Sequence, residues 1–369
     1  MRKKTRAEPT MQKHQKIYPA VLCAESPAYP TGCAPPVSIT TVEPLRLKPN
    51  KIIIGVDVMG SDHPPSLLLE AIATLTPPPG VSLLVLGPPD YREPFPHAYH
   101  PTYEAISLSE HPLTALRRKK EASLCVGLRL LKAGAIHAFV SAGNTGALVT
   151  ASKMILSMQP HLMRPALLAL MPTKKRPVAV LDVGANVQVK AAHLIQFAYM
   201  AAAYLASHGI SHPSIGILNI GSEPLKGTSE LRLAYPQLQS LKAPFHFAGN
   251  IEGTSVFDGN VDALITDGFT GNVFLKTAEG IASLILDRIQ AAFPGNALSQ
   301  IGAKIGDLHQ HLHYAEYPGA LLLGVRGIVI KCHSYSTPQA FINGVKGAID
   351  LTQSHFMDRF QKHLQRSFR

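Results

Sequence analysis

The sequence predicts an α/β protein with a mostly parallel sheet that is covered by helices on both faces. Apolar runs of strand length alternate with segments of helical periodicity, and several runs end in a polar loop that leads into a helix. The run 178–181 illustrates this, because Asp182, Gly184 and Asn186 follow it and a helical pattern opens near Lys190. We therefore expect strands that deliver polar loops to the starts of helices at one edge of the sheet.

Composition sets the limits of this prediction. The 369 residues suffice for one large domain or two medium ones, and 46% are apolar. No apolar run reaches the roughly 18 residues of a membrane span. The formal net charge is +11, of which residues 1–51 carry +6 (nine basic minus three acidic) and residues 356–369 carry +3 (four minus one). The basic ends are either solvated or attract an acidic protein or anionic lipid; no nucleic-acid motif accompanies them, so nucleic acid is not an expected partner.

Cysteine usage points to a reducing compartment. Cys23, Cys33, Cys125 and Cys332 form no CxxC pair, which argues against a disulfide scaffold and against a structural zinc site. Lys and Arg near the N-terminus precede no long apolar segment, so a secretory signal is not expected. We predict a cytoplasmic protein without a metal.

The first half of the chain begins with a proline-rich segment. Residues 1–50 hold eight prolines and are predicted to be a disordered basic extension, so that the folded α/β domain runs over 51–355. Strands are expected over 52–58, 81–86 and 138–141, with a short edge strand at 105–108. Helices are expected over 64–75 and from the basic cluster 117–120 to about 133.

The second half continues the alternation. Strands are expected near 166–171, 178–182, 214–219, 245–249, 261–266 and 321–330, and helices after 146, over 190–207, 226–240 and 276–293, and from 338. Residues 281–315 are predicted to be a helical excursion from the sheet. Its apolar stripe is either a core face or a contact surface for a dimer or a membrane. Residues 356–369 are predicted to be a basic tail.

Five predicted strand ends carry Asp, Asn and Gly, in the segments 54–62, 140–146, 180–186, 218–223 and 265–272. Ligands of open α/β sheets bind at the carboxyl ends of the strands, so we expect these loops to meet at a common edge. Glycine loops at helix starts present free N–H groups to phosphate, although a tight turn explains any one of them equally well.

Common motifs of other enzyme classes are missing from the sequence. It contains no P-loop, no G-x-G-x-x-G after a strand, no H-E-x-x-H and no G-x-S-x-G. These absences argue against nucleotide hydrolysis, ordinary dinucleotide binding, zinc proteolysis and serine hydrolysis.

In combination, the polar blocks resemble the PlsX-type phosphate acyltransferases of bacterial phospholipid synthesis. The matching blocks are VDVMGSD (56–62), LRRKKEASL (116–124), VSAGNTGAL (140–148), RPALLALMPT (164–173), VLDVGANVQVKAAHLIQFA (180–198), IGILNIGSEPLKGT (215–228), and the segments 247–280 and 316–336. Two departures occur: Ser61 replaces a glycine, and Tyr335 alters a late KSHGSS-like segment. Ser61 fits only if its backbone φ is not strongly positive.

The resemblance implies transfer of a fatty acyl group from acyl carrier protein to inorganic phosphate. It also implies a Rossmann-like α/β/α sandwich related to isocitrate and isopropylmalate dehydrogenases and to phosphotransacetylase. A homodimer and a peripheral membrane contact are further implications. No metal or organic cofactor is expected. The acyl phosphate would pass to a glycerol-3-phosphate acyltransferase.

From this resemblance and from charge arguments we predict the site residues. The catalytic set is Asn144, Asn186, Lys190, Lys226 and Asp182, with Asp182 as an orienting acid. The substrate-binding set is Asp57, Gly60, Asp62, Ser141, Gly143, Thr145, Gly146, Asn219, Gly221, Asn250, Asp267, Gly268 and Asn272. The acidic carrier is expected to dock on Arg117, Arg118, Lys119 and Lys120, unless these residues are only a solvated helix start.

Three alternatives stay open at this point. An isopropylmalate-type dehydrogenase would need NAD recognition and clustered acidic metal ligands, and neither pattern is present. A phosphotransacetylase-like enzyme would use CoA instead of the carrier. A membrane-associated protein that kept the fold and lost activity is the non-enzymatic alternative.

Overall fold

The computed structural model describes residues 51–91, 95–292, 319–335 and 337–368. They belong to one compact unit that spans residues 47–369. The predicted extension 1–50 and residues 293–315 of the predicted helical excursion lie outside the described residues. Among the described residues, no helix is both long enough and apolar enough to cross a membrane.

Eleven strands of the described chain form one sheet, in the order β3-β2-β1-β4-β11-β10-β5-β6-β9-β7-β8. The elements of the first half are β1 (Ile52–Asp57), α1 (Pro65–Thr74), β2 (Val81–Gly87), the 3-10 turn η1 (Pro89–Tyr91), β3 (Ala98–Pro101), α2 (Pro112–Arg118), α3 (Ser123–Lys132), β4 (Ala138–Ser141) and α4 (Thr145–Leu156). The prediction of a mostly parallel sheet is confirmed, since seven of the ten strand pairings are parallel.

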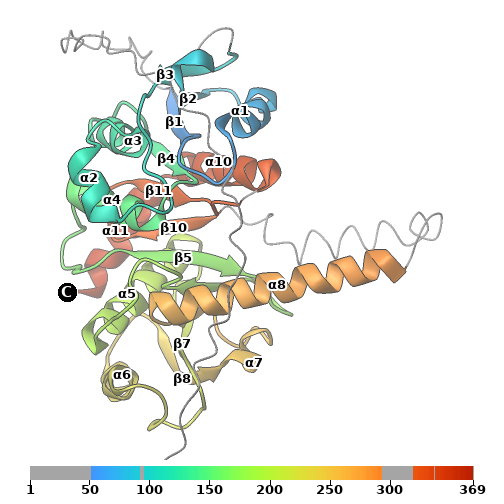
Figure 1. Cartoon of the computed structure of the whole chain (residues 1–369). Coiled ribbons are helices and arrows are strands. Elements are labelled where there is room, and N and C mark those ends of the chain that lie inside the picture. The colour runs from blue at the N-terminus through green and yellow to red at the C-terminus, as the bar shows by residue number, and fades with distance from the viewer. Residues whose placement is uncertain (1–50, 92–94, 293–318, 336, 369) are drawn as a thin grey trace, which may run out of the picture. The chain divides into compact units, whose positions relative to one another are not determined.

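The second half supplies the other strands and the longest helices. Its elements are β5 (Ala166–Met171), β6 (Val178–Leu181), α5 (Ala191–Ser207), β7 (Ser214–Asn219), α6 (Ser229–Ser240), β8 (His246–Glu252), α7 (Gly253–Val256), β9 (Ala263–Ile265), α8 (Gly268–Ala292), β10 (Ala320–Leu323), β11 (Ile328–Lys331), α10 (Pro338–Gln353) and α11 (Phe356–Ser367). In Figure 1, β1–β4 lie in one half of the view and β7 and β8 in the other.

The expectation of a common edge for all five polar loops is wrong. β10 pairs antiparallel with both β11 and β5, and β5 pairs antiparallel with β6. The strands β6, β9, β7 and β8 therefore run opposite to β1–β4 and β11. Because of this reversal, the loops after β1 and β4 leave their strands in one direction and those after β6, β7 and β9 in the opposite direction, although the register places the end of β6 level with the end of β4.

Two apolar layers fill the space between the sheet and its helices. One layer packs α1, α5, α6, α10 and α11 on one face, and the other packs α2, α3, α4, α7 and α8 on the opposite face. Apolar side chains on both faces explain why the strands read as continuous apolar runs. The α/β/α sandwich follows from this two-sided burial.

Three segments differ from their predicted structure. The edge strand lies at Ala98–Pro101 and not at 105–108. The basic cluster ends α2 at Arg118 and does not begin a helix. Residues 356–367, predicted as part of a tail, form α11, whose Phe356, Phe360 and Leu364 are buried against the molecule. Basic residues dominate the polar face of α11. A count of charges therefore suggested a tail, although apolar residues recur on the opposite face.

Candidate functional site: a cationic pocket under helix α8

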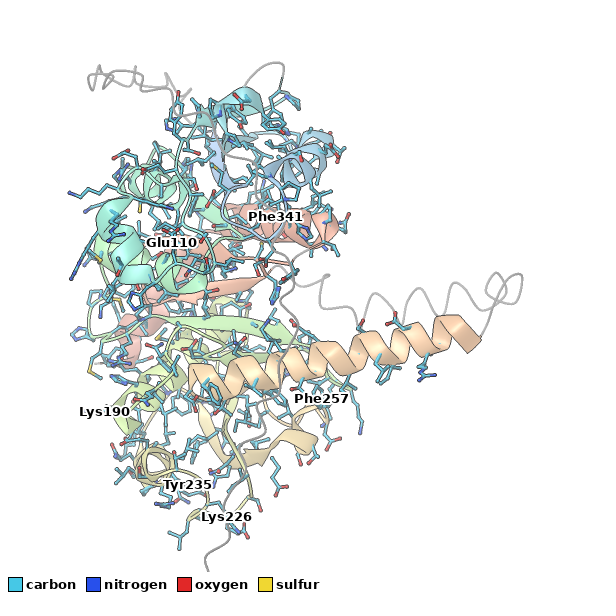
Figure 2. The ribbon with its side chains drawn as sticks, viewed as in Figure 1. Glu110, Lys190, Lys226, Tyr235, Phe257 and Phe341 are labelled. Carbon is cyan, nitrogen blue, oxygen red and sulfur yellow. The ribbon has the colours of Figure 1, made fainter. Side chains whose placement is uncertain are left out.

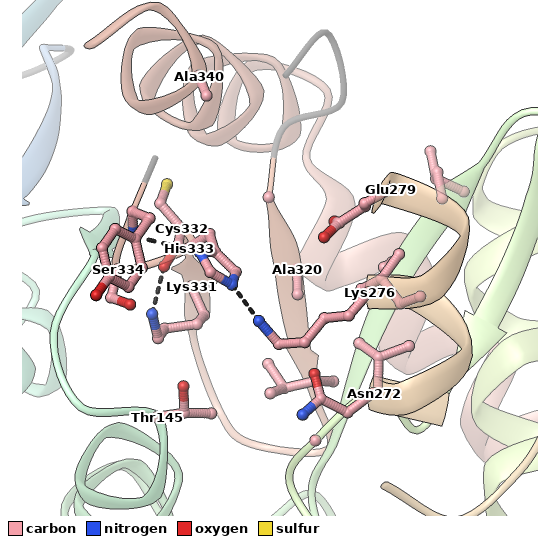
Figure 3. A pocket seen from close by; sticks show the side chains of 18 of the residues that line it. Thr145, Asn272, Lys276, Glu279, Ala320, Lys331, Cys332, His333, Ser334 and Ala340 are labelled. Atoms are coloured by element: carbon pink, nitrogen blue, oxygen red, sulfur yellow. Dashed lines mark hydrogen bonds between the residues drawn. The ribbon is translucent and has the colours of Figure 1, made fainter. Parts of the chain in front are cut away.

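A cavity of about 360 Å³ lies over the central strands β5 and β10, between α8 and the loop that follows β11 (Figure 3). Its floor and walls are largely apolar. They include Leu108, Leu167, Ala169, Leu170, Val183, Leu275 and Ala320. The polar lining consists of Thr145, Asn272, Lys276, Glu279, Lys331, His333, Ser334 and Tyr335. The pocket therefore combines an apolar chamber with a cationic end.

Lys331 is the buried cation of this end. It is the last residue of β11, and only 7% of it is exposed. Its Nζ donates to the carbonyl oxygen of Ala142 at 3.3 Å and to that of Cys332. Within the described chain Lys331 forms no ion pair with a carboxylate, so its charge is compensated only by carbonyl dipoles and by more distant acids.

His333, two residues after Lys331, contacts α8. Its Nε2 lies 2.5 Å from Nζ of Lys276, and its Nδ1 accepts a hydrogen bond from the backbone N–H of Tyr335 at 3.2 Å. Figure 3 shows the side chains of Lys276 and Asn272 on α8 directed toward the loop after β11. Three basic side chains from two distant segments thus meet in one pocket.

Burial and mutual repulsion set the charge of this cluster. Burial lowers the pKa of Lys331 from 10.5 to about 8, and the charge of Lys276 adds to the decrease. Burial together with the charges of Lys276 and Lys331 lowers the pKa of His333 to about 4. At neutral pH His333 is therefore neutral, while Lys331 is still mainly protonated.

Cys332 lies between Lys331 and His333 in the sequence but is not part of the basic cluster. Burial raises the pKa of its thiol to about 12, and an added Cβ at Gly344 of α10 would overlap its Sγ. Cys332 is therefore a packed, protonated thiol. A thiol in this environment is a poor nucleophile.

The loop after β4 reaches the pocket at the start of α4. Ser141 donates from Oγ to Oδ2 of the buried Asp57 at 2.9 Å and accepts the N–H of Gly143 at 3.1 Å. Thr145, the first residue of α4, lines the cavity beside Lys331. An α-helix leaves the N–H groups of its first turn unpaired, so α4 directs its positive end toward this part of the site.

Asn144, at the same helix start, uses its side-chain amide in hydrogen bonds to the backbone. Its Oδ1 accepts the N–H of Ala147 at 3.0 Å, which caps α4. Its Nδ2 lies 3.1–3.2 Å from the carbonyl oxygens of Ser107, Leu108 and Glu110. The predicted catalytic amide therefore joins α4 to the 107–110 loop, and its catalytic role stays a prediction.

The loop after β1 approaches the same region. Gly60 has a φ of +75°, and an added Cβ would lie 2.9 Å from the carbonyl oxygen of Ile106, so glycine is needed there. Ser61 is not among the described residues with positive φ, which meets the condition set by the sequence. Asp62 is exposed, and its backbone N–H donates to the carbonyl oxygen of Ser334 at 3.3 Å.

Asp182 and Asn186 organise the loop after β6. The two carboxylate oxygens of Asp182 accept five hydrogen bonds, from the backbone N–H groups of Leu167, Gly184, Ala185 and Asn186 and from Nδ2 of Asn186. Burial raises the pKa of Asp182, and these donors oppose the rise. Both residues hold the loop, whose Val183 and Gly184 line the cavity.

The start of α8 packs directly on that loop. The N–H of Gly268 donates to the carbonyl oxygen of Asn186 at 2.7 Å, and an added Cβ there would lie 2.8 Å from two backbone atoms of Asn186. Asp267 accepts the N–H and Oγ1–H of Thr270, each at 2.8 Å. These contacts fix the position of α8 and, with it, the positions of Asn272 and Lys276.

The remaining predicted residues are not in the pocket lining. Asn219 and Asn250 are buried, and their amides donate to the carbonyl oxygens of Lys226 and Glu223, which holds the 220–227 loop with Gly221. The Lys226 side chain is exposed and lies 3.7 Å from a Glu223 carboxylate oxygen. Lys190 is exposed at the start of α5, and both lysines lie at the periphery in Figure 2.

The predicted docking cluster divides into two kinds of residue. Arg117, Arg118 and Lys120 are exposed. Lys119 is half-buried, pairs with Glu110 at 2.8 Å and donates to the carbonyl oxygen of Ala105 at 2.8 Å. Three of the four cations are thus free to meet a partner, and the fourth supports the 105–110 loop.

Sequence reasoning placed Thr145 and Asn272 among the site residues but missed Lys276, Lys331, His333 and Glu279. A signal existed for two of them: the strand 328–331 ends in Lys-Cys-His-Ser, as the other polar strand ends do. Lys276 lay inside a helical pattern, where a single lysine usually faces solvent. Among the described residues, no group of three or more His, Cys, Asp or Glu side chains is arranged to hold a metal.

Comparison with solved structures defines the class of fold. A phosphotransacetylase from Streptococcus pyogenes superposes with a TM-score of 0.53 at 15% identity, over 83% of this chain and 94% of that one. At this identity the likeness shows a shared fold alone.

Sequence comparison defines the family. Residues 52–359 match the family described as "Fatty acid synthesis protein". The phosphate acyltransferase of Caulobacter vibrioides is 39% identical over 332 residues, which cover 85% of this chain and 92% of that protein. The one of Heliobacterium modesticaldum is 37% identical over 327 residues, or 84% and 97% of the two chains. The chain therefore belongs to this fatty acid synthesis protein family.

Proposed function

We propose that this protein transfers a fatty acyl group from the thioester of an acyl carrier protein to inorganic phosphate. The products are an acyl phosphate and the free carrier thiol. Relatives with the name phosphate acyltransferase, similar over most of the chain, support the reaction class. The observation that carries the proposal is the joining of a cationic end to an apolar chamber in one pocket.

The cationic end suits a phosphate dianion. Lys331 has no carboxylate partner within ion-pair distance in the described chain, and a buried ammonium without a counter-charge costs several kcal/mol. An anion bound between Lys331 and the first turn of α4 would remove that cost and add N–H donors. Thr145 lies at this place, whereas Asp57 is held away from the anion by Ser141 and Met59.

The apolar chamber suits the beginning of an acyl chain. Leu167, Ala169, Val183, Leu275 and Ala320 line it beside the cations. An acyl group placed there brings its thioester carbonyl next to the bound phosphate, and such positioning lowers the barrier for attack by converting an encounter into an intramolecular step. Donors near the carbonyl then stabilise the developing oxyanion.

The test is direct turnover with palmitoyl carrier protein and inorganic phosphate. Acyl phosphate is trapped as a hydroxamate, and thiol release is followed in the same reaction. We expect Lys331→Ala to reduce kcat/KM for phosphate at least 100-fold, since it removes the buried cation, and Lys346→Ala on the exposed side of α10 to leave it unchanged. Equal activity of the two variants would contradict the assignment of Lys331 to phosphate.

A second candidate donor is acyl-CoA, which the fold shared with phosphotransacetylases favours. Both donors carry the same pantetheine thioester, so the discrimination rests on the protein part of the carrier. If Arg117, Arg118 and Lys120 dock an acidic carrier, their joint reversal to Glu should raise KM for palmitoyl carrier protein, most strongly at low salt. KM for palmitoyl-CoA should change much less.

The homodimer and the peripheral membrane contact are further parts of the proposal. On α8, Ile281, Leu284 and Ile285 are 52%, 52% and 46% exposed, and the helix extends beyond the other elements in Figure 1. Such an apolar stripe fits a second copy or a lipid surface. Leu284→Glu should weaken either contact, as measured by light scattering and by vesicle flotation. Two more expectations stay predictions. One is a relation of the fold to isocitrate and isopropylmalate dehydrogenases, and the other is delivery of the acyl phosphate to a glycerol-3-phosphate acyltransferase.

A further inference from the structure

The contact between Lys276 and His333 is not explained by phosphate binding. Lys331 already places a cation beside the start of α4, and a second lysine near it increases repulsion. Yet Nζ of Lys276 lies 2.5 Å from Nε2 of His333, on the side of the pocket that α8 covers. An arrangement that keeps two lysines and a histidine together needs a reason in the chemistry of the site.

Hydrogen-bond accounting on His333 shows what this contact can do. A neutral imidazole has one N–H donor and one acceptor nitrogen. Because Nδ1 accepts the N–H of Tyr335, the ring proton is on Nε2, which then donates to a free Lys276 amine. When Lys276 is an ammonium, it donates to Nε2, the ring proton is on Nδ1, and the bond from Tyr335 is lost. The two arrangements differ by one proton on Lys276.

The imidazole itself does not hold that extra proton. The low pKa of His333, about 4, is caused by burial and by the charges of Lys276 and Lys331. A proton that this pair gives to a bound molecule therefore comes from the nitrogen of Lys276. The other charged groups near Lys276 are Lys331 and Glu279, and burial raises the pKa of the Glu279 carboxyl, which limits its charge.

The proposed reaction needs a proton at a defined atom. When phosphate adds to the thioester carbonyl, the intermediate can expel either phosphate or thiolate, and thiolate is the more basic of the two. Collapse therefore returns to the starting materials unless the sulfur is protonated as the bond breaks. General acid catalysis of such a step is typically worth about 10²–10⁴-fold in rate.

We propose that Lys276 is the catalytic acid that protonates the departing thiolate and that His333 is the positioning residue that holds its amine over the pocket. This inference rests on the proposed function. An oxygen of hydrogen phosphate forms the C–O bond, the C–S bond breaks with its electron pair on sulfur, and the Lys276 ammonium gives sulfur a proton. The free amine then takes the remaining proton of the acyl phosphate, which leaves as a dianion with the free thiol.

Lys331 is less suited to this role because of its position. Its Nζ is bound to two carbonyl oxygens, is buried, and faces the loop after β4. Lys276 is an exposed residue on α8, and its side-chain hydrogen bond within the described chain is to His333. This geometry assigns the buried cation to phosphate and the exposed amine to the proton.

The leaving group provides the test. Wild type, Lys276→Ala, Lys276→Arg, His333→Gln and the control Lys346→Ala are assayed with palmitoyl pantetheine and with the palmitoyl thioester of 4-nitrothiophenol, whose thiolate leaves without a proton. We expect Lys276→Ala to lose at least 100-fold in kcat with pantetheine and less than 10-fold with the aryl thioester. Lys276→Arg keeps the charge but gives up its proton poorly, so it should resemble Lys276→Ala in kcat while KM for phosphate stays near that of wild type.

His333 has its own readout. His333→Gln keeps one acceptor for the amine, so it should reduce kcat with pantetheine about tenfold, shift the alkaline limb of the pH profile of kcat, and leave KM for phosphate unchanged. Equal losses of Lys276→Ala with both donors, or full activity of Lys276→Arg with pantetheine, would overturn the proposal. A wild-type protein that forms no acyl phosphate from either thioester would refute the proposed function itself.

Discussion

Substituting alanine at two glycines of α8, Gly271 and Gly280, distinguishes the effect of helix propensity from the effect of packing. At Gly271 an added Cβ overlaps the carbonyl oxygen of Asp182 and lies 2.8 Å from Cγ2 of Thr266 and 3.1 Å from the carbonyl carbon of Asp182. At Gly280 an added Cβ meets nothing within 4 Å. Alanine at either position should gain about 1 kcal/mol of helix propensity, so only the packing term differs.

The magnitude follows from that difference. Overpacking costs about 1–3 kcal/mol, and the upper end applies at Gly271 because a carbonyl group of the backbone cannot rotate away. Gly271→Ala should therefore be destabilised by about 2 kcal/mol net, and Gly280→Ala stabilised by up to about 1 kcal/mol. At roughly 2–4 °C per kcal/mol, the two melting temperatures should differ by about 6–12 °C in differential scanning fluorimetry.

The same substitution has a functional consequence. If α8 moves away from Asp182, Lys276 and Asn272 move with it, so Gly271→Ala should also lose turnover at temperatures where it is folded. Gly280→Ala should keep wild-type turnover. Equal melting temperatures for the two variants would refute the reasoning that the contact between Gly271 and Asp182 sets the position of α8.

The remaining predictions concern charge and packing. Burial lowers the pKa of Lys331 to about 8, and only its protonated form attracts phosphate; the charged neighbours are Asp57, Asp62 and Lys276. KM expressed for the phosphate dianion should therefore be constant below pH 7 and rise about tenfold by pH 9. A flat profile to pH 9 would contradict this. Burial raises the pKa of Asp57 from 3.8 to about 6, so its contribution to stability is full below pH 4 and lost as pH rises through 6. Between pH 4 and 7 the free energy of unfolding of the wild type, measured with urea, should fall by about 3 kcal/mol relative to that of Asp57→Asn. Parallel plots of unfolding free energy against pH for the two proteins would count against this. Phe360→Ala should cost about 3–5 kcal/mol while Lys362→Ala stays within about 0.5 kcal/mol, and similar urea midpoints would show that α11 is not packed.

Much of the fold could be predicted because burial on both faces leaves a strong pattern. The runs 52–58 and 178–181 are strands since a parallel strand under two helical layers needs apolar side chains in succession. The start of α5 near Lys190 was predicted from the helical pattern that opens there. α11 was not, because its three buried residues, Phe356, Phe360 and Leu364, lie among basic residues that a charge count treats as a tail.

The site was predicted only in part, for a physical reason. Asn144, Asp182 and Asn186 were recognised as special, and the structure uses each of them to hold a loop. An Asn or Asp at a strand end looks the same in sequence whether its side chain faces a ligand or a backbone group. Which of the two applies depends on carbonyl and N–H groups contributed by distant segments, such as Ser107 and Leu167.

The sequence alone determined an α/β sandwich with polar loops at its strand ends, since periodicity and turn chemistry are local properties. Only the tertiary structure decided that the strand direction reverses at β10 and β5, and that the loops after β4, β6 and β9 nevertheless line one pocket. The sheet places β11 between β4 and β10, next to the site covered by α8, so that Lys331 and His333 meet Lys276, which lies 55 residues before Lys331 in the chain. Strand direction and helix placement are set by pairing across the whole sheet, and no local pattern contains them.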